Sequence, residues 1–252
     1  MRKKEKLEIV SDVSKKYVHK FATFLSIIVC IITDIVFLFV PNKLFVCGYF
    51  ERRWGKILHN NWGDDINVFF LHEITGKKIF LKNNSYVYRW LPIHNYGCIG
   101  SIIGRNTDKH SEIWGSGLIS ETVNSQRISS KINSVRGPLT RAALIKHGIE
   151  CPERYGDPAL LVSKYYKPDI DKRYELGIVT HIEDEDNDVV KEYCSKYPDV
   201  LVVKMRGYHH WHDIPDQILS CKRIISSSLH GLIIADSYGI PNVWVRFSDN
   251  IL

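Results

Sequence analysis

Metal-binding cysteine pairs and low-complexity segments are both missing from this chain of 252 residues. Its six cysteines stand at positions 30, 47, 98, 151, 194 and 221, too far apart for a Cys-x-x-Cys zinc site. We expect reduced thiols, as in a cytoplasmic protein, rather than disulfides or a catalytic cysteine. Nine prolines, sixteen glycines and 44% hydrophobic residues exclude a linker or fibrous protein and indicate a folded core.

Positive charge is in small excess. The chain has 34 lysines and arginines against 28 acids, a formal net charge of +6. Residues 1–20 contain seven basic and three acidic residues, which gives +4, so the other 232 residues carry only +2. A nucleic-acid-binding domain is expected to be more basic than this over a folded face. We therefore predict no nucleic-acid partner.

The longest apolar run is residues 21–40. As a helix it is about 30 Å long, the thickness of the hydrocarbon layer of a bilayer. The basic residues before it are typical of a cytoplasmic amino terminus, whereas Asp34 near its middle costs about 2.5–3.5 kcal/mol on insertion. It lacks the small-residue cleavage site of a signal peptide. A membrane span, a helix packed on the globular part and a hairpin of apolar elements all remain open.

Short β-rich runs alternate with helical segments after residue 41, which favours an α/β fold with parallel sheets covered by helices. The expected strands are Leu44–Tyr49, Glu112–Trp114, Ile132–Val135, Glu175–His181, Val200–Lys204 and Arg223–Ser226. The expected helices are Ile66–Thr75, Pro138–His147, Asp184–Tyr197, Pro215–Ser220 and His230–Tyr238. Because the polar stretch Tyr165–Arg173 indicates a boundary, we expect three parts: a basic terminus with an apolar helix (1–40), an N-terminal half (41–168) and a C-terminal half (169–252).

Two clusters of small and acidic residues stand where strands are expected to end, the edge at which α/β sheets bind ligands. The segment Asn61–Asp65 contains two adjacent acids, Asp64 and Asp65. One of them is expected to cap the helix that follows, or else to bind or deprotonate a sugar hydroxyl. The Gly115-Ser116-Gly117 turn after Trp114 lets a ligand approach the backbone closely, although many strand-to-helix turns share this pattern.

Two further clusters indicate anion binding. Arg136 and Arg141 flank the start of the helix expected at Pro138, where free N–H groups favour an anion; surface ion pairs are the alternative. His230 follows three serines, 226–228, at another helix start, which favours a phosphate or carboxylate contact or a proton donor. The histidines at 209, 210 and 212 lack further ligands at metal-site spacing, so we expect a loop there and no metal.

Five motifs occur in order along residues 44–246. They are Asn-Trp-Gly-Asp-Asp (61–65), Trp-Gly-Ser-Gly (114–117), Val-Arg-Gly-Pro-x-x-Arg (135–141), Tyr-Gly-Asp-Pro-Ala-Leu-Leu (155–161) and Ser-Ser-Leu-His-Gly-x-x-x-Ala-Asp-x-Tyr-Gly-Ile-Pro (227–241). Their order resembles that of the polysaccharide pyruvyl transferase family. The resemblance implies two Rossmann-like halves in a glycosyltransferase-B-like arrangement. It also implies transfer of a pyruvyl group, as a ketal, from phosphoenolpyruvate to a hexose of an exopolysaccharide, a capsule or a lipid-linked precursor, with no metal or organic cofactor.

The resemblance assigns roles by position. His230 is expected to be a general acid or phosphate ligand, Arg136 to face it across the cleft, and Asp64 or Asp65 to orient or deprotonate the acceptor hydroxyl. The remaining residues expected to bind substrate are Arg141, Ser227, Ser228, Leu229, Gly115, Ser116 and Gly117.

Two departures from the family pattern affect these expectations. Some members have Arg where this chain has Ser228, so Arg141 or Arg246 is expected to supply the missing charge. Members also continue beyond the position of Leu252, so a shortened C-terminal half is expected. A nucleotide-sugar glycosyltransferase and an inactive glycan-binding homologue are the alternatives. Since phosphoenolpyruvate is cytosolic, we predict that residues 21–40 dock on the cytoplasmic face of the membrane or on the domain and do not cross the bilayer.

Overall fold

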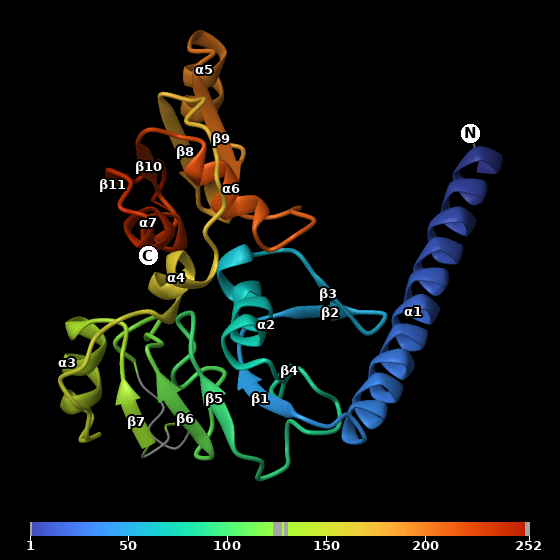
Figure 1. The fold of residues 1–252 in the computed structure, drawn as a ribbon. Helices are drawn as coiled ribbons and strands as arrows, with labels where there is room; N and C mark the ends of the chain where they lie inside the picture. Colours follow the sequence, from blue (N-terminus) through green and yellow to red (C-terminus); the bar gives the residue numbers. More distant parts are fainter. Residues whose placement is uncertain (1, 123–127, 129–130, 250–252) are drawn as a thin grey trace.

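The computed structural model describes residues 2–122, 128 and 131–249, and has two parallel sheets with a long helix beside them (Figure 1). The N-terminal sheet has the order β4-β1-β5-β6-β7, and all its neighbours are parallel. Its strands are β1 (Lys43–Cys47), β4 (Lys78–Leu81), β5 (Asn95–Gly97), β6 (Ser111–Trp114) and β7 (Lys131–Ser134). The helices of this half are α2 (Trp62–Thr75) and α3 (Pro138–Lys146), and a hairpin of β2 (Glu51–Arg53) and β3 (Lys56–Leu58) projects from it.

The C-terminal sheet has the order β11-β10-β8-β9 and is also parallel. Its strands are β8 (Leu176–Thr180), β9 (Val200–Lys204), β10 (Ile224–Ser226) and β11 (Asn242–Trp244), and its helices are α5 (Asp188–Lys196), α6 (Asp213–Leu219) and α7 (Leu229–Ser237). A 3-10 turn (Pro158–Leu161) and α4 (Val162–Tyr165) join the halves. The predicted α/β class with parallel sheets is confirmed; the glycosyltransferase-B-like arrangement stays a prediction. Residues 250–252 of the expected C-terminal half lie outside the described residues.

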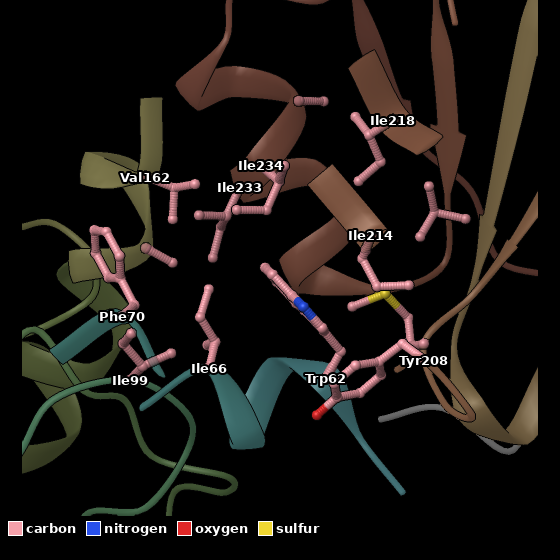
Figure 2. Packing of buried hydrophobic residues seen from close by; sticks show 14 of the residues in the cluster. Trp62, Ile66, Phe70, Ile99, Val162, Tyr208, Ile214, Ile218, Ile233 and Ile234 are labelled. Carbon is pink, nitrogen blue, oxygen red and sulfur yellow. The ribbon is translucent and has the colours of Figure 1, made fainter. Parts of the chain in front are cut away.

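Helix α2 connects the two sheets through one hydrophobic core. Trp62 is fully buried, and its backbone N donates to Met205 O (2.7 Å) and its Nε1 to Trp211 O (2.5 Å) in the C-terminal half. Ile66 and Phe70 continue the same buried face (Figure 2). The halves are therefore joined by packed side chains along α2.

Two expected helices begin at different residues because asparagines cap them. Helix α2 begins at Trp62 rather than Ile66, since Asn61 Oδ1 accepts a hydrogen bond from Gly63 N (3.1 Å). Of the two alternatives for Asp64 and Asp65, the role of helix cap is therefore excluded. The helix expected from Asp184 is interrupted, because Asn187 Oδ1 accepts from Val189 N (3.0 Å) and starts α5 at the next residue.

The apolar N-terminal segment is one continuous helix, α1 (Arg2–Leu38). Its stretch Lys15–Leu38 is long and apolar enough to cross a membrane by length and composition, and 17% of its most apolar window is buried. Only the later turns contact the domain, and the earlier turns project away from it (Figure 1). Lys43 Nζ donates to the carbonyls of Phe37 (3.2 Å) and Leu38 (2.6 Å), so a cation satisfies the carboxyl end of the helix.

Candidate active site

A cavity of about 250 Å³ lies where loops from both sheets meet the amino-terminal ends of α2 and α7. The loops follow the carboxyl ends of β1, β5, β7, β8 and β10, the usual position of ligand sites in parallel sheets. The lining residues are Tyr49, Asn61, Asp64, Gly100, Ser101, Ile102, Arg105, Asn106, Ile119, Arg136, His181, Ser228, Leu229 and His230. Five residues expected from the sequence are therefore brought together: Asp64, Arg136, Ser228, Leu229 and His230.

Arg136 lies across the backbone of Gly117. A Cβ at Gly117 would come within 2.5 Å of Arg136 Nη2, so only glycine leaves room for the guanidinium. Nη2 donates to Ser101 Oγ (2.7 Å), whereas the buried Nη1 has no hydrogen-bond partner among the described residues. Burial lowers the pKa of Arg136, and the nearby Asp157 and Asp64 counteract this. One guanidinium nitrogen is thus desolvated and available to an anion.

His230 is the second residue of α7 and packs against the start of α2. A Cβ at Gly63 would lie 2.1 Å from His230 Nδ1, so Gly63 creates the space for the ring. The Nε2 atom is buried with no partner within the described part of the chain. Burial, and then the charge of Arg136, lower the pKa of His230 to about 3. The ring is neutral at pH 7. Ser228 starts α7 without a side-chain cap bond, so the first N–H groups of the helix face the same region.

Asp64 and Asp65 face different cavities. Asp64 Oδ2 accepts from Asn61 Nδ2 (2.7 Å), and burial followed by the charge of Asp65 raises the pKa of Asp64 to about 7. Asp65 Oδ2 accepts from Tyr208 Oη (2.6 Å), and burial raises its pKa to about 7 as well. Asp65 lines an adjacent cavity of about 310 Å³, which shares Tyr49 and Asn61 with the first. The two carboxyls are a coupled pair that keeps a proton near neutral pH.

The Trp-Gly-Ser-Gly motif supports the cavity from behind. Gly115 N donates to Ser134 O (3.0 Å), Gly117 N to Gly100 O (3.0 Å), and Ser116 O accepts from Arg136 N (3.0 Å). Gly115 has φ +87°, and a Cβ there would meet Gly156 O at 2.4 Å. None of Gly115, Ser116 and Gly117 is among the lining residues, so this motif holds the strand-end loops together.

Three further expected residues also lie outside the lining. Ser227 Oγ accepts from His181 N (2.9 Å), which ties the ends of β8 and β10 together. Arg141 Nε donates to Cys151 O (3.1 Å) on the other side of α3. Arg246 Nε donates to Ser248 O (3.1 Å) in its own loop. The cation that lines the cavity in addition to Arg136 is Arg105, whose guanidinium lies 5.0 Å from the centre of the Tyr49 ring.

Sequence reasoning did not identify Tyr49, Ser101, Arg105 or His181. Each lies in a loop just after a strand, and none belongs to a repeated spacing, so the only available signal was position at a strand end. Burial lowers the pKa of His181. Among the described residues, no group of three or more histidines, cysteines and acids is arranged to hold a metal ion.

Other candidate sites have fewer groups that are suited to catalysis or ligand binding. A larger cavity of about 680 Å³ lies between β7 and the end of α3, but its charged residues, Glu150 and Arg154, are exposed. All six cysteines are free thiols, and burial raises the pKa of Cys47 and Cys98 to about 12. These two thiols are therefore protonated at neutral pH and unsuited to nucleophilic catalysis.

Comparison with known proteins agrees with the sequence motifs. An uncharacterized protein of Acanthamoeba polyphaga mimivirus is 30% identical over 201 residues, which cover 74% of this chain and 64% of that protein, so the matched part spans less than two thirds of the relative. No solved structure matches the chain. The model of the family described as polysaccharide pyruvyl transferase matches residues 127–249, which include Arg136, His181 and His230 but not Asp64. The expected resemblance to the polysaccharide pyruvyl transferase family is thereby confirmed over residues 127–249, where the model of that family matches this chain.

Proposed function

We propose that the cavity transfers a pyruvyl group from phosphoenolpyruvate to a hexose of an exopolysaccharide, a capsule polysaccharide or a lipid-linked precursor. The observation that carries this proposal is the pair of unpartnered buried nitrogens, Arg136 Nη1 and His230 Nε2, beside the start of α7. A donor with a carboxylate and a phosphate supplies acceptors for both nitrogens and for the helix N–H groups. The family match over the same residues supports this choice of donor class.

The reaction has two steps in this proposal. A sugar hydroxyl adds across the donor's C2=C3 bond: its oxygen bonds to C2, its proton passes to a base, and an acid delivers a proton to C3. A second hydroxyl then bonds to C2, and the C2–O bond to phosphate breaks with its electron pair going to phosphate. The phosphate takes up the second hydroxyl's proton. The products are the cyclic ketal and inorganic phosphate.

The pKa values assign the proton-transfer roles. Asp64, with a pKa of about 7, is half ionised at neutral pH and suits acceptance of the hydroxyl proton. His230 is neutral in the free protein because its pKa is about 3. A bound dianion would raise that pKa, since a nearby negative charge favours imidazolium. His230 thus acts first as a phosphate ligand, and becomes an acid only with the donor in place.

The adjacent cavity suits the acceptor. Tyr49 contributes an aromatic ring that is 47% exposed, and Glu51, Asn60 and Arg206 contribute hydrogen-bonding groups at its edge. Aromatic faces combined with planar polar groups match the alternating apolar and hydroxyl surfaces of a hexose. Because the donor is cytosolic, the proposed location is the cytoplasm or the cytoplasmic face of the membrane.

Phosphate release from phosphoenolpyruvate with a panel of hexoside acceptors tests the proposal. Arg136→Ala and His230→Ala are expected to lower acceptor-dependent release by about 100- to 1,000-fold, the usual effect of removing a charge-stabilising group. Arg141→Ala is the matched control, because this arginine lies five residues away and contacts Cys151 instead of the cavity.

The outcomes separate the alternatives. Release that is equally lost in the control would place the effect in folding. Folded wild-type protein that binds no phosphoenolpyruvate would contradict the proposal and favour a non-catalytic glycan-binding homologue. Binding of a nucleotide sugar in place of phosphoenolpyruvate would identify a glycosyltransferase.

A further inference from the structure

Helix α1 turns Ser26, Asp34 and the ring of Phe37 to the domain, whereas most of its large apolar side chains point outward. Ser26, Cys30 and Asp34, spaced four residues apart, are 6%, 1% and 0% exposed against the β2–β3 hairpin and the chain after β4. The outward side chains are apolar and exposed, among them Phe21, Phe24, Ile28, Ile32, Ile35 and Val36. A helix that packs on a soluble domain has the opposite arrangement.

The contacts between α1 and the β2–β3 hairpin limit the length of apolar helix that is free to enter a bilayer. Trp54 N donates to Ser26 Oγ (2.8 Å), and Arg52 Nη1 pairs with Asp34 Oδ1 (2.8 Å), so the hairpin covers the helix from residue 26 onward. The part of the apolar run that precedes these contacts, residues 21–25, is only about 8 Å long, roughly a quarter of the hydrocarbon thickness. A span over all of Lys15–Leu38 would place the Arg52–Asp34 pair and the hairpin tip in hydrocarbon.

The outward face is wide. At about 100° per residue, the exposed apolar side chains fill an arc of roughly 160°, broader than the narrow seam by which one helix packs on another. A lipid surface covers such an arc, whereas a single partner helix leaves much of it in water.

Charge and aromatic residues beside this face match an anionic lipid surface. Lys16 and Lys20 are exposed in the turns before the apolar face, within a terminus of net charge +4 over residues 1–20. Trp54 at the hairpin tip is 43% exposed, and Tyr86, whose backbone N donates to Asp34 Oδ2 (2.8 Å), is 41% exposed. Amphipathic rings and lysines at the border of an apolar face are typical of helices that lie in the membrane interface.

We infer that α1 is an interfacial anchor: its outward apolar face inserts into one leaflet of an anionic bilayer, while its Ser26-Cys30-Asp34 stripe holds the domain on the same side of that bilayer. The cavity and the membrane-bound face then lie on opposite faces of strand β2, since Glu51 lines the acceptor cavity and the next residue, Arg52, pairs with the helix. The inference does not depend on the transferase activity, because phosphate release with a soluble hexoside requires no membrane.

Binding of the full chain to lipid vesicles tests whether the outward apolar face of α1 contacts the membrane. We expect co-sedimentation with vesicles of equal parts phosphatidylcholine and phosphatidylglycerol, weakened by salt and by omission of phosphatidylglycerol. Replacing Phe24 and Ile28 together by Glu should lower binding at least about tenfold, because two buried apolar side chains become charged. Leu139→Glu is the matched control, since Leu139 is 85% exposed on α3, away from this face. Urea unfolding midpoints that match the wild type in the absence of vesicles show that both variants are folded.

Sidedness tests docking against spanning. In a Cys194→Ser background, Lys3→Cys and Lys196→Cys are labelled with a membrane-impermeant maleimide in inverted membrane vesicles from expressing cells. Equal labelling of both positions supports the anchor. Labelling of one position without the other means that the helix crosses the bilayer and overturns the inference; Lys3→Cys alone is the result expected of a span with a cytoplasmic amino terminus. Wild-type protein that ignores anionic vesicles and sediments as a dimer would also overturn it, because a second copy would then cover the face.

Discussion

Two regions of this protein that contain buried carboxylates differ in their surroundings. At the junction of α1 with the domain, Asp34 accepts from Arg52 Nη1 (2.8 Å), Ser85 Oγ (2.7 Å) and Tyr86 N (2.8 Å). At the meeting of α2 and α7, Asp64 lines one cavity with Arg136 and His230, each of which retains a buried nitrogen without a partner among the described residues.

This difference distinguishes a buried charge with a structural role from one that belongs to a ligand site. A buried charge whose hydrogen bonds are all made within the chain holds its surroundings in one arrangement. A buried charge left incomplete is costly unless something else supplies the missing atoms. The first pattern therefore marks Asp34 as a structural residue, and the second marks the α2–α7 cavity as a ligand site.

The largest expected effect is on stability at the first region. Asp34→Ala leaves Arg52 without its charge partner, and we expect the free energy of unfolding to fall by about 3–5 kcal/mol. Urea titration followed by tryptophan fluorescence measures this change, and phosphate release with a soluble acceptor should remain close to wild type. Asp64→Ala is the comparison, because it removes a poorly solvated carboxyl from an incomplete site and should cost far less. An equal fall in the free energy of unfolding of both variants would contradict the distinction between the two regions.

Gly63→Ala should affect activity next most strongly. The added Cβ would meet the His230 ring at 2.1 Å, so the ring must move. A displacement of about 1 Å in a catalytic group lowers kcat/KM by up to about 100-fold. Phosphate-release kinetics measure the loss. In a His230→Ala background the same substitution should cause no further loss, and an additional loss there would mean that Gly63 acts through the fold of α2.

The pH dependence sharpens the assignment of the carboxyl pair. The folded pKa values of Asp64 and Asp65, about 7, lie above the ordinary value of 3.8, so the folded state binds protons more tightly than the unfolded state between these limits. The contribution of the pair to stability is full below about pH 4 and is lost as pH rises to about 7, a change on the order of 4 kcal/mol for each proton that the folded pair retains. Urea titrations across this range should show that Asp64→Asn flattens the dependence, and phosphate release should rise with an inflection near pH 7 that this variant lacks. A pH dependence unchanged in the variant would assign the titration elsewhere.

The smallest effect is expected at Arg141. Its Nε donates to a single backbone carbonyl, that of Cys151, so Arg141→Gln should lower stability by about 0.5–1.5 kcal/mol and leave kcat/KM within about twofold. Thermal unfolding and phosphate release measure the two quantities. A large loss of activity would extend the ligand site to the far side of α3.

Much of this architecture follows from local pattern. The alternation of β-rich and helical segments predicts both parallel sheets, and Val200–Lys204 is a strand with the predicted bounds. Gly148 follows the end of α3 with φ +73°, as its place after the helix predicts. The strands β4 and β5 and the β2–β3 hairpin are not among the predicted elements.

The site was partly predictable for a different reason. The order of the motifs predicts that Arg136 and His230 belong to the ligand site, because both stand at helix starts after strands. The pattern does not predict that Asp64 and Asp65 face different cavities or that Arg105 enters the lining, since these depend on side-chain direction and on the packing of one half against the other. Asp34 shows the same limit: from the sequence its carboxylate argues only against a membrane span, and the local pattern does not predict its partners at residues 52, 85 and 86, far along the chain.

That separation along the chain has a consequence for synthesis. Asp34 leaves the ribosome 52 residues before Tyr86, an interval of about 3–10 s at 5–20 residues per second. During this interval the apolar helix is complete but its docking site does not exist. The unpaired carboxylate then opposes premature insertion across a bilayer by about 2.5–3.5 kcal/mol. Asp34 thus opposes insertion of the helix across a bilayer until the domain on which the helix packs has been synthesised.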